Sequence, residues 1–349
     1  MNGSDVIKLF PNCIPVKGAR RSVLCDLATG RMKLIPNGLH EVLSKYPNDS
    51  IDDIKAAYHH RHDREIESYF NFILAENWGF CCETPEDFPE MDLSFESPER
   101  IHNAIIDTDA DSNHDYRDLF QQLIALGCRY IQLRFFSPRP HGECEAILSL
   151  SEDTPLLGLD LVIPFAPDTR EDRLFDWCKR YRRIFRIVIH GAPENRRVQP
   201  DPAACLAPLE FVETPITSHH HCGFTHRNSF QVSMAMFTES MTFNNCLHKK
   251  IAIDARGDIR NCPAMPEQFG STGSASLAQA LDHGGFRDFW TVTKDQVEVC
   301  RDCEFRYVCL DCRAHPSRPG DRLSKPEGCG YDPYTATWQN PPLTISLTV

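Results

Sequence analysis

The sequence predicts an α/β protein built in three parts, and three observations support this. Residues 1–90 contain apolar-rich strands followed by helical patterns, and residues 100–240 alternate between strand and helix. Residues 241–349 are rich in cysteine and have little hydrophobic periodicity. With 349 residues, the chain is long enough for one large core or two to three ordinary domains.

The first part is expected to be a winged-helix-like unit. Its expected elements are strands at 6–14, 22–27 and 31–35, and helices that begin near residue 36, span 51–60 and follow an apolar stripe over 66–74. Gly30 suits the turn between the second and third strands, and Ser50 suits the N-cap of the second helix. The acidic, proline-containing segment 83–98 is expected to be a linker.

The second part is expected to form a partial (β/α) barrel or an open parallel sheet. The expected elements are strands at 104–106, 130–136, 159–165 and 184–190, helices at 116–126 and 170–181, and further strands at 209–212 and 230–237. Each strand reads as a short apolar run, which is typical of strands buried on both faces. About 145 residues are too few for a complete eight-stranded barrel.

Charge and hydropathy exclude several classes of protein. The chain has 37 Lys and Arg residues against 49 Asp and Glu, and this acidic balance disfavours a nucleic-acid partner. No apolar run approaches the roughly 18 residues that cross a bilayer, and the first residues lack the pattern of a signal peptide. We therefore expect a cytoplasmic protein without a membrane partner.

Cysteine is the most informative residue type in this chain. There are 16 cysteines, and a reducing cytosol makes disulfides improbable, so that metal ligation and buried thiols remain as interpretations. Seven of them lie between Cys246 and Cys329. That region lacks the periodicity of a large apolar core, so a metal is expected to hold it together.

The cysteine spacing is typical of a metal site. It reads Cys246-x15-Cys262, then Cys300-x2-Cys303-x5-Cys309-x2-Cys312, then Cys329. Gaps of two residues allow consecutive thiolates to face one metal centre. A hairpin formed by 251–254 and 258–260 would bring Cys246 and Cys262 to the same end. Ligand identity alone leaves both iron-sulfur and zinc open.

The third part resembles the SPASM domain, and most closely the SPASM-domain peptide maturases of grasp-with-spasm systems. The resemblance covers residue 240 to the end. It rests on the motifs Asn245-Cys246-Leu247, Asn261-Cys262-Pro263, Lys294-Asp295-Gln296, Cys300-Arg301-Asp302-Cys303, Glu304-Phe305-Arg306-Tyr307, Asp311-Cys312-Arg313-Ala314 and Tyr331-Asp332-Pro333-Tyr334.

The resemblance implies two 4Fe-4S clusters. One cluster would be held by Cys300, Cys303, Cys309 and Cys329. The other would be held by Cys246, Cys262 and Cys312, with Cys222 supplying the fourth thiolate. The gap of two residues before Cys312 differs from the three usual in SPASM domains.

The resemblance also implies that the second part is a degenerate radical-SAM-like barrel. Radical SAM enzymes carry C-x3-C-x2-C after the first strand, where three cysteines leave one iron open to the cofactor. The corresponding loop here, 107–114, contains no cysteine, and the motif occurs nowhere in the chain. We therefore expect that this chain does not bind S-adenosylmethionine (SAM).

The first part resembles a PqqD-type precursor-recognition element, with a simple packing domain as the alternative. Together the resemblances imply a protein that matures a ribosomally synthesised peptide with an ATP-grasp ligase. It would bind the leader of the precursor and present the rest. Two alternatives remain open: a zinc-stapled structural adaptor, and a redox enzyme that acts through its auxiliary clusters. Whether the chain is itself an enzyme is left undecided.

Overall fold

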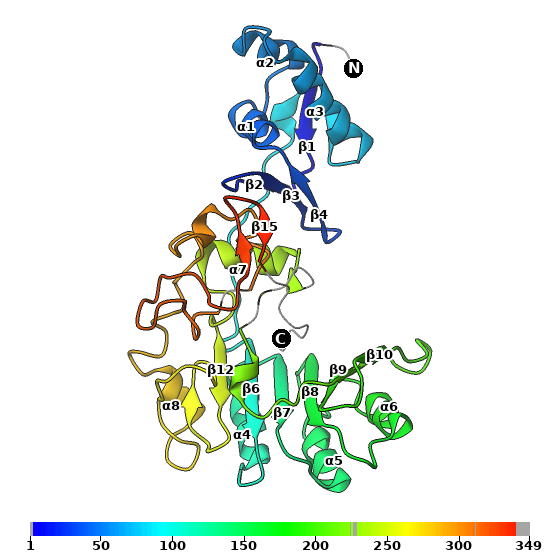
Figure 1. Ribbon diagram of the computed structural model, residues 1–349, viewed down its shortest axis with the longest axis vertical. Coiled ribbons are helices and arrows are strands. Elements are labelled where there is room, and N and C mark those ends of the chain that lie inside the picture. The colour runs from blue at the N-terminus through cyan, green and yellow to red at the C-terminus, as the bar shows by residue number, and fades with distance from the viewer. Residues whose placement is uncertain (1–2, 224, 226–228, 311, 340–349) are drawn as a thin grey trace.

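The computed structural model describes residues 3–223, 225, 229–310 and 312–339. The N-terminal strands and helices lie at one end of the longest axis, and a large sheet with its helices lies at the other (Figure 1). Helix α7 (Met234–Thr242) and the last, orange to red part of the chain lie between them (Figure 1). The cysteine-rich region is therefore placed where it can contact both ends.

A mostly parallel sheet of eight strands organises the larger end of the described structure. Its order is β10-β11-β9-β8-β7-β6-β12-β13, and the pairings from β11 to β12 are all parallel. The strands are β6 (Asn103–Thr108), β7 (Tyr130–Phe135), β8 (Gly158–Pro164), β9 (Ile184–His190), β10 (Arg196–Val198), β11 (Leu209–Val212), β12 (Lys250–Ile253) and β13 (Ile259–Arg260). This confirms the α/β class. The sheet is open, as the short length of this part predicts.

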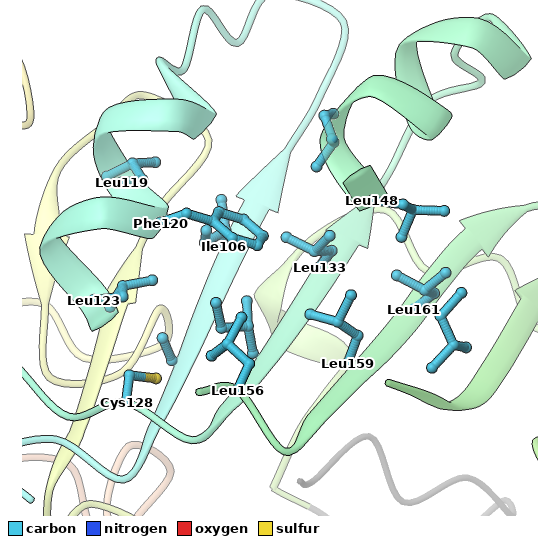
Figure 2. Close-up of a cluster of buried hydrophobic side chains, with 14 of the residues drawn as sticks. Ile106, Leu119, Phe120, Leu123, Cys128, Leu133, Leu148, Leu156, Leu159 and Leu161 are labelled. Atoms are coloured by element: carbon cyan, nitrogen blue, oxygen red, sulfur yellow. The ribbon is translucent and has the colours of Figure 1, made fainter. Parts of the chain in front are cut away.

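Helices cover one face of this sheet. Helices α4 (Tyr116–Ala125), α5 (His141–Ser149) and α6 (Glu171–Arg180) connect neighbouring strands in turn, which places them on the same side. Figure 2 shows Leu119, Phe120 and Leu123 of α4 against Ile106 of β6, with the leucines of β7 and β8 beside them. Helix α8 (Leu277–Leu281) packs onto the same apolar cluster. The sequence analysis missed α5, although its buried residues have helical spacing.

The other face of the sheet is buried and carries a row of polar residues, so we call it the polar face. Asp160 on β8 accepts hydrogen bonds from Gln132 and Arg186 on the two adjacent strands. Asp107 on β6 accepts two hydrogen bonds, of 2.5 and 2.7 Å, from Arg134 on β7. The expectation that these strands are apolar on both faces therefore holds only in part. Charged residues that compensate each other occupy part of this face, and Val162, Val188 and Val212 form an apolar cluster on the same face.

The N-terminal unit has its own apolar core. Its elements are β1 (Val6–Leu9), β2 (Cys13–Val16), β3 (Ser22–Asp26), β4 (Arg31–Ile35), α1 (Asn37–Lys45), α2 (Ile51–Ala57), α3 (Asp63–Ala75) and β5 (Gly79–Cys82). Strands β2, β3 and β4 form an antiparallel sheet, and β1 pairs with β5. The expected strand 6–14 is two strands, because Pro11 has no N–H and a turn closes from Cys13 N to Phe10 O.

The rest of the chain contains short elements. They are β14 (Tyr331–Asp332), β15 (Thr337–Trp338) and the 3-10 turns Pro85–Asp87, His219–His221 and Cys300–Asp302. The expected strand at 230–237 is wrong, because Ser233 caps α7 by accepting a hydrogen bond from Met236 N. None of the described helices combines the length and apolarity needed to cross a bilayer.

The N-terminal unit is clasped to the cysteine-rich region. Between β2 and β3, Ala19 N donates to Asp302 O at 2.7 Å, and Arg21 pairs with the fully buried carboxylate of Glu304 at 2.8 Å. Tyr331 donates to the same carboxylate. In addition, Val23 and Cys25 of β3 share an apolar cluster with Phe305 and Val308 of the cysteine-rich region. The segment that carries Cys300 and Cys303 is therefore part of the N-terminal interface.

Asp26 gives a prediction about stability at low pH. Although burial opposes it, hydrogen bonds from Thr29, Arg31 and Asn12 lower the pKa of Asp26 to about 2. This stabilisation is present above the ordinary Asp pKa and is lost as the pH falls towards 2. We expect Asp26→Asn to lower the free energy of unfolding at pH 7 by on the order of 2 kcal/mol.

The measurement is urea denaturation of both proteins from pH 7 to pH 2. The difference should shrink below about pH 4, where the Asp26 carboxylate of the unfolded wild-type chain begins to protonate while the folded one stays ionised. Asp49→Asn, at an exposed position of the same unit, serves as the control. A difference between Asp26→Asn and wild type that does not change with pH would contradict this account.

The Arg21–Glu304 pair predicts a measurable coupling between the two regions. Arg21→Met would leave the buried Glu304 carboxylate without its cation, at an expected cost of roughly 2 to 4 kcal/mol. Glu304→Gln removes the charge, so we expect the double variant to recover part of that loss. A double-mutant cycle by denaturant unfolding measures the coupling energy. A coupling near zero would show that this pair does not clasp the regions.

Candidate metal centre

Four cysteines from separate segments line one cavity beside the polar face of the sheet. These are Cys222, Cys246, Cys262 and Cys312, which we call the first thiol group. Ile105 and Arg134 of the sheet line the same cavity, as does Lys250 at the start of β12. The structure therefore brings together the four residues that the resemblance assigns to one cluster.

The β12–β13 hairpin places two of these thiols. Strand β12 pairs in parallel with β6 and antiparallel with β13, so Cys246 precedes and Cys262 follows the hairpin at the same end. Asn244 Oδ1 accepts hydrogen bonds from the N–H groups of Cys246 and Leu247. Asn261 donates to the carbonyls of Leu247 and Lys250 at 2.9 and 2.8 Å. The expected hairpin geometry is confirmed, and buried asparagines fix it.

A close backbone approach places the other two thiols. Gly223 has a φ of +93°, and a Cβ atom there would lie 3.0 Å from Cys312 Sγ and 2.9 Å from a ring carbon of His315. Any side chain at this position would therefore press against the Cys312 loop. Glycine allows the segment of Cys222 to lie against that of Cys312.

The four thiols influence one another electrostatically. Burial and the neighbouring Cys246 and Cys222 raise the pKa of Cys262 to about 12. Burial and the same neighbours raise the pKa of Cys312 well above its usual value, whereas N–H groups at Ala264 and Ala314 act in the opposite direction on Cys262 and Cys312. A group of buried thiols needs positive charge before it can ionise, and a bound metal centre would supply it.

Two cations of the sheet face the first thiol group. Lys250 is 4% exposed, and its Nζ lies 3.9 Å from Cys246 Sγ. Burial lowers the pKa of Lys250, but the four thiols outweigh this and raise it. Arg134 lines the cavity while its guanidinium is held by Asp107. Cations and N–H donors around the thiolates are typical of iron-sulfur and zinc centres.

The second thiol group comprises Cys300, Cys303, Cys309 and Cys329. Burial raises the pKa of Cys303 well above its usual value, and Cys309 and Cys300 raise it further. Cys303 also accepts a hydrogen bond from Phe305 N at 3.4 Å. Cys303, Cys309 and Cys329 pack against the same apolar cluster. The structure thus places Cys300 and Cys309 within electrostatic reach of Cys303, while Cys329 packs against the same apolar cluster as Cys303 and Cys309.

A strained turn introduces the second group. Val299 has φ +66° and ψ −44°, and Cys300 N donates to Glu298 O at 2.7 Å across it. This is a γ-turn with positive φ, which is costly for a β-branched residue. Such strain persists where the surrounding structure fixes the backbone, and it is typical of functional sites.

The two groups interlock. Asn245, next to Cys246 of the first group, donates to the carbonyl of Cys309 in the second at 3.0 Å. Lys294 donates to the same carbonyl. Thr225 forms a β-bridge with Cys329, and its N–H bonds Gly328 O at 3.0 Å. The two groups are therefore joined by direct backbone contacts.

Other candidates from the sequence do not gather in this way. Cys128, Cys144 and Cys178 lie in the apolar cluster under the helices, as expected for small apolar residues. Across the described ranges, no three His, Cys, Asp or Glu side chains are grouped closely enough to hold a single metal ion. The candidate centre therefore rests on the shared cavity, the mutual electrostatics and the donors around the sulfurs.

Sequence reasoning missed the residues that support the thiols. Lys250 and Arg134 could have been recognised as charges that alternate with apolar residues within short strands. Asn261 belongs to one of the motifs that carry the resemblance, but the roles of Asn244 and Asn261 depend on contacts between distant segments, which the sequence does not show. Of the segment 107–114 that was expected to be a loop, Asp107 and Thr108 belong to β6, and Asp107 is held by Arg134.

Comparison with known proteins gives limited information. The chain matches no protein-family model and no curated protein. Among solved structures it is similar to Streptococcus suis SuiB bound to S-adenosylmethionine, with 10% identity, 92% of this chain and 99% of that chain covered, and a TM-score of 0.37. SuiB bound to its precursor peptide SuiA gives 9% identity, the same coverage and a TM-score of 0.35. Scores at this level establish neither a shared fold nor a function.

Gly223 gives a prediction about the first thiol group. Gly223→Ala adds both a Cβ contact with Cys312 Sγ and backbone strain, so we expect metal affinity at the first group to fall about tenfold or more. Gly320→Ala is the matched control, because Gly320 also has positive φ, of +81°, but its Cβ would meet open space. Metal retained per chain under chelator competition measures the effect. Equal retention in both variants would show that the close approach is unimportant.

Proposed function

We propose that this protein takes part in the maturation of a ribosomally synthesised peptide, together with an ATP-grasp ligase. In this proposal it is an iron-sulfur protein that binds the leader of the precursor and presents the rest of the peptide. The carrying observation is the pair of interlocked thiol groups, one against the polar face of the sheet and one against the N-terminal unit.

The proposed clusters are supported by the donor set. Eight thiols would hold two 4Fe-4S clusters, the first by Cys222, Cys246, Cys262 and Cys312, and the second by Cys300, Cys303, Cys309 and Cys329. The first four line one cavity together with Lys250 and Arg134. When bound, each cluster would supply cross-linking between distant segments and a site for one electron. The chain's own residues would orient the sulfurs and balance their charge.

Leader binding is supported by the edge of the N-terminal sheet. Strand β4 pairs only with β3 in the described structure, and it exposes Met32 and Leu34. An unpaired strand edge with apolar side chains suits addition of a peptide as a further strand. The clasp through Arg21 and Glu304 would then hold the bound leader close to the second thiol group.

A presenting role is favoured over SAM chemistry. The loop after β6 has no cysteine to hold a SAM-binding cluster, and Asp107, near the end of β6, is bound to Arg134. We therefore assign bond formation in the precursor to the ligase. A zinc-stapled adaptor and a redox enzyme acting through its own clusters remain as outcomes of the tests.

The first test is the metal and sulfide content of protein purified without air, with its visible spectrum. We expect about eight iron and eight sulfide per chain, falling to about half in Cys246→Ser and in Cys303→Ser. Cys128→Ser, in the apolar cluster, is the control. About two zinc per chain without sulfide would instead favour the zinc-stapled adaptor.

The second test is co-expression of precursor and ligase with and without this protein. We expect loss of water from the precursor, read by mass spectrometry, only when ligase is present, and at a higher yield with this protein.

The double substitution Met32→Ser with Leu34→Ser should weaken leader binding about tenfold. Modified precursor formed without the ligase would favour the redox enzyme, and a yield independent of this protein would contradict the proposal.

A further inference from the structure

Lys250 is a buried cation whose partners are sulfur atoms. Its side chain lies in the cavity of the first thiol group, and its Nζ contacts Cys246 Sγ at 3.9 Å. Across the described ranges, no carboxylate lies within ion-pair distance of this ammonium. The neighbouring Lys249 differs, because its Nζ donates to the carbonyl of Ser97 at 2.6 Å.

A buried ammonium without an anion is costly. An unpaired charge in the protein interior costs several kcal/mol even after relaxation, so the cation requires a compensating negative charge. The other buried cations of the sheet have carboxylates: Arg134 is held by Asp107, Arg186 by Asp160, and Arg260 by Asp254. For Lys250, the available negative charge is that of the four sulfurs.

The position of Lys250 has a direct consequence for a cluster at this site. A 4Fe-4S cluster held by four thiolates is anionic, and reduction adds a further negative charge. A fixed positive charge at the sulfurs stabilises the reduced form more than the oxidised form, because the Coulomb energy scales with the charge. Hydrogen bonding to the sulfurs and local charge are known to set such potentials.

We propose that Lys250 is the positioning residue that balances the charge of the first thiol group and raises the reduction potential of the cluster held there. This inference rests on the proposed function, because it assumes metal-bound thiolates at the first group. Arg134 contributes less, since Asp107 already neutralises it.

The experiment compares wild-type protein with Lys250→Met, Lys250→Arg and Lys249→Met, purified without air. Iron and sulfide content is measured first, and each cluster's potential is then measured by a redox titration monitored by EPR. Methionine keeps the length of the side chain without its charge, and arginine restores a charge. Lys249→Met removes the neighbouring charge outside the cavity, and the second cluster is an internal reference in every protein.

We expect Lys250→Met to lower the equilibrium constant for reduction of one cluster about tenfold. For a one-electron couple this is a shift of about 59 mV to a more negative potential. Lys250→Arg should lie nearer to wild type, and Lys249→Met should not shift either cluster. If Lys250→Met holds only half the iron while Lys250→Arg holds all of it, the iron content shows that the first thiol group needs a cation at this position. Unchanged potentials and full content in Lys250→Met would overturn the inference.

Failure of the proposed function gives a different result. If the wild-type protein holds zinc and no sulfide, the cluster assignment falls, and the same four proteins are compared for their affinity for zinc alone. If Lys250→Met alone binds zinc more weakly, Lys250 still balances the charge of the four sulfurs, but in a zinc site. Equal affinity in all four proteins would overturn the charge-balancing role as well.

Discussion

The parallel pairing of β12 with β6 is the constraint on which the candidate centre depends. It attaches the start of the cysteine-rich region to the first strand of the sheet, which fixes where Cys246 and Cys262 meet. It also turns Lys250 onto the polar face, where Arg134 lines the same cavity. The other two thiols then need only to reach this fixed pair, and Gly223 allows their loops to do so. The sheet therefore acts as the rigid support of a loop-rich region.

The same region joins the two ends of the molecule. The segment around Cys303 contacts the N-terminal unit through Glu304 and Phe305, and the backbone of Cys309 is bound by Asn245 of the first group. A region with few regular elements gains little stability from its own backbone, so bound metal would contribute to its folding. Metal occupancy, the first thiol group and the N-terminal interface are therefore expected to be coupled, because they share these short segments.

Much of this architecture was predictable, because regular elements leave local signals. The strands of the sheet other than β10, together with α4 and α6, follow from short apolar runs and helical periods, and the hairpin pattern predicted that Cys246 and Cys262 meet at one end. The strand expected at 230–237 failed because the cap at Ser233 outweighed the apolar alternation. The polar face of the sheet was missed because Gln132 and Arg134 are satisfied by residues on other strands, about which local sequence carries no information.

The charged residues of the polar face differ in whether a carboxylate compensates them. On the polar face, Asp160 with Arg186 and Asp107 with Arg134 form closed pairs, so these charges stabilise the sheet but leave little field outside it. Lys250 is at the end of this row, and its compensation comes from the thiols. The charge of this face that no carboxylate neutralises, that of Lys250, therefore lies at the first thiol group. A cation that is paired only with sulfur affects whatever those sulfurs bind, which a fully paired arginine cannot do to the same extent.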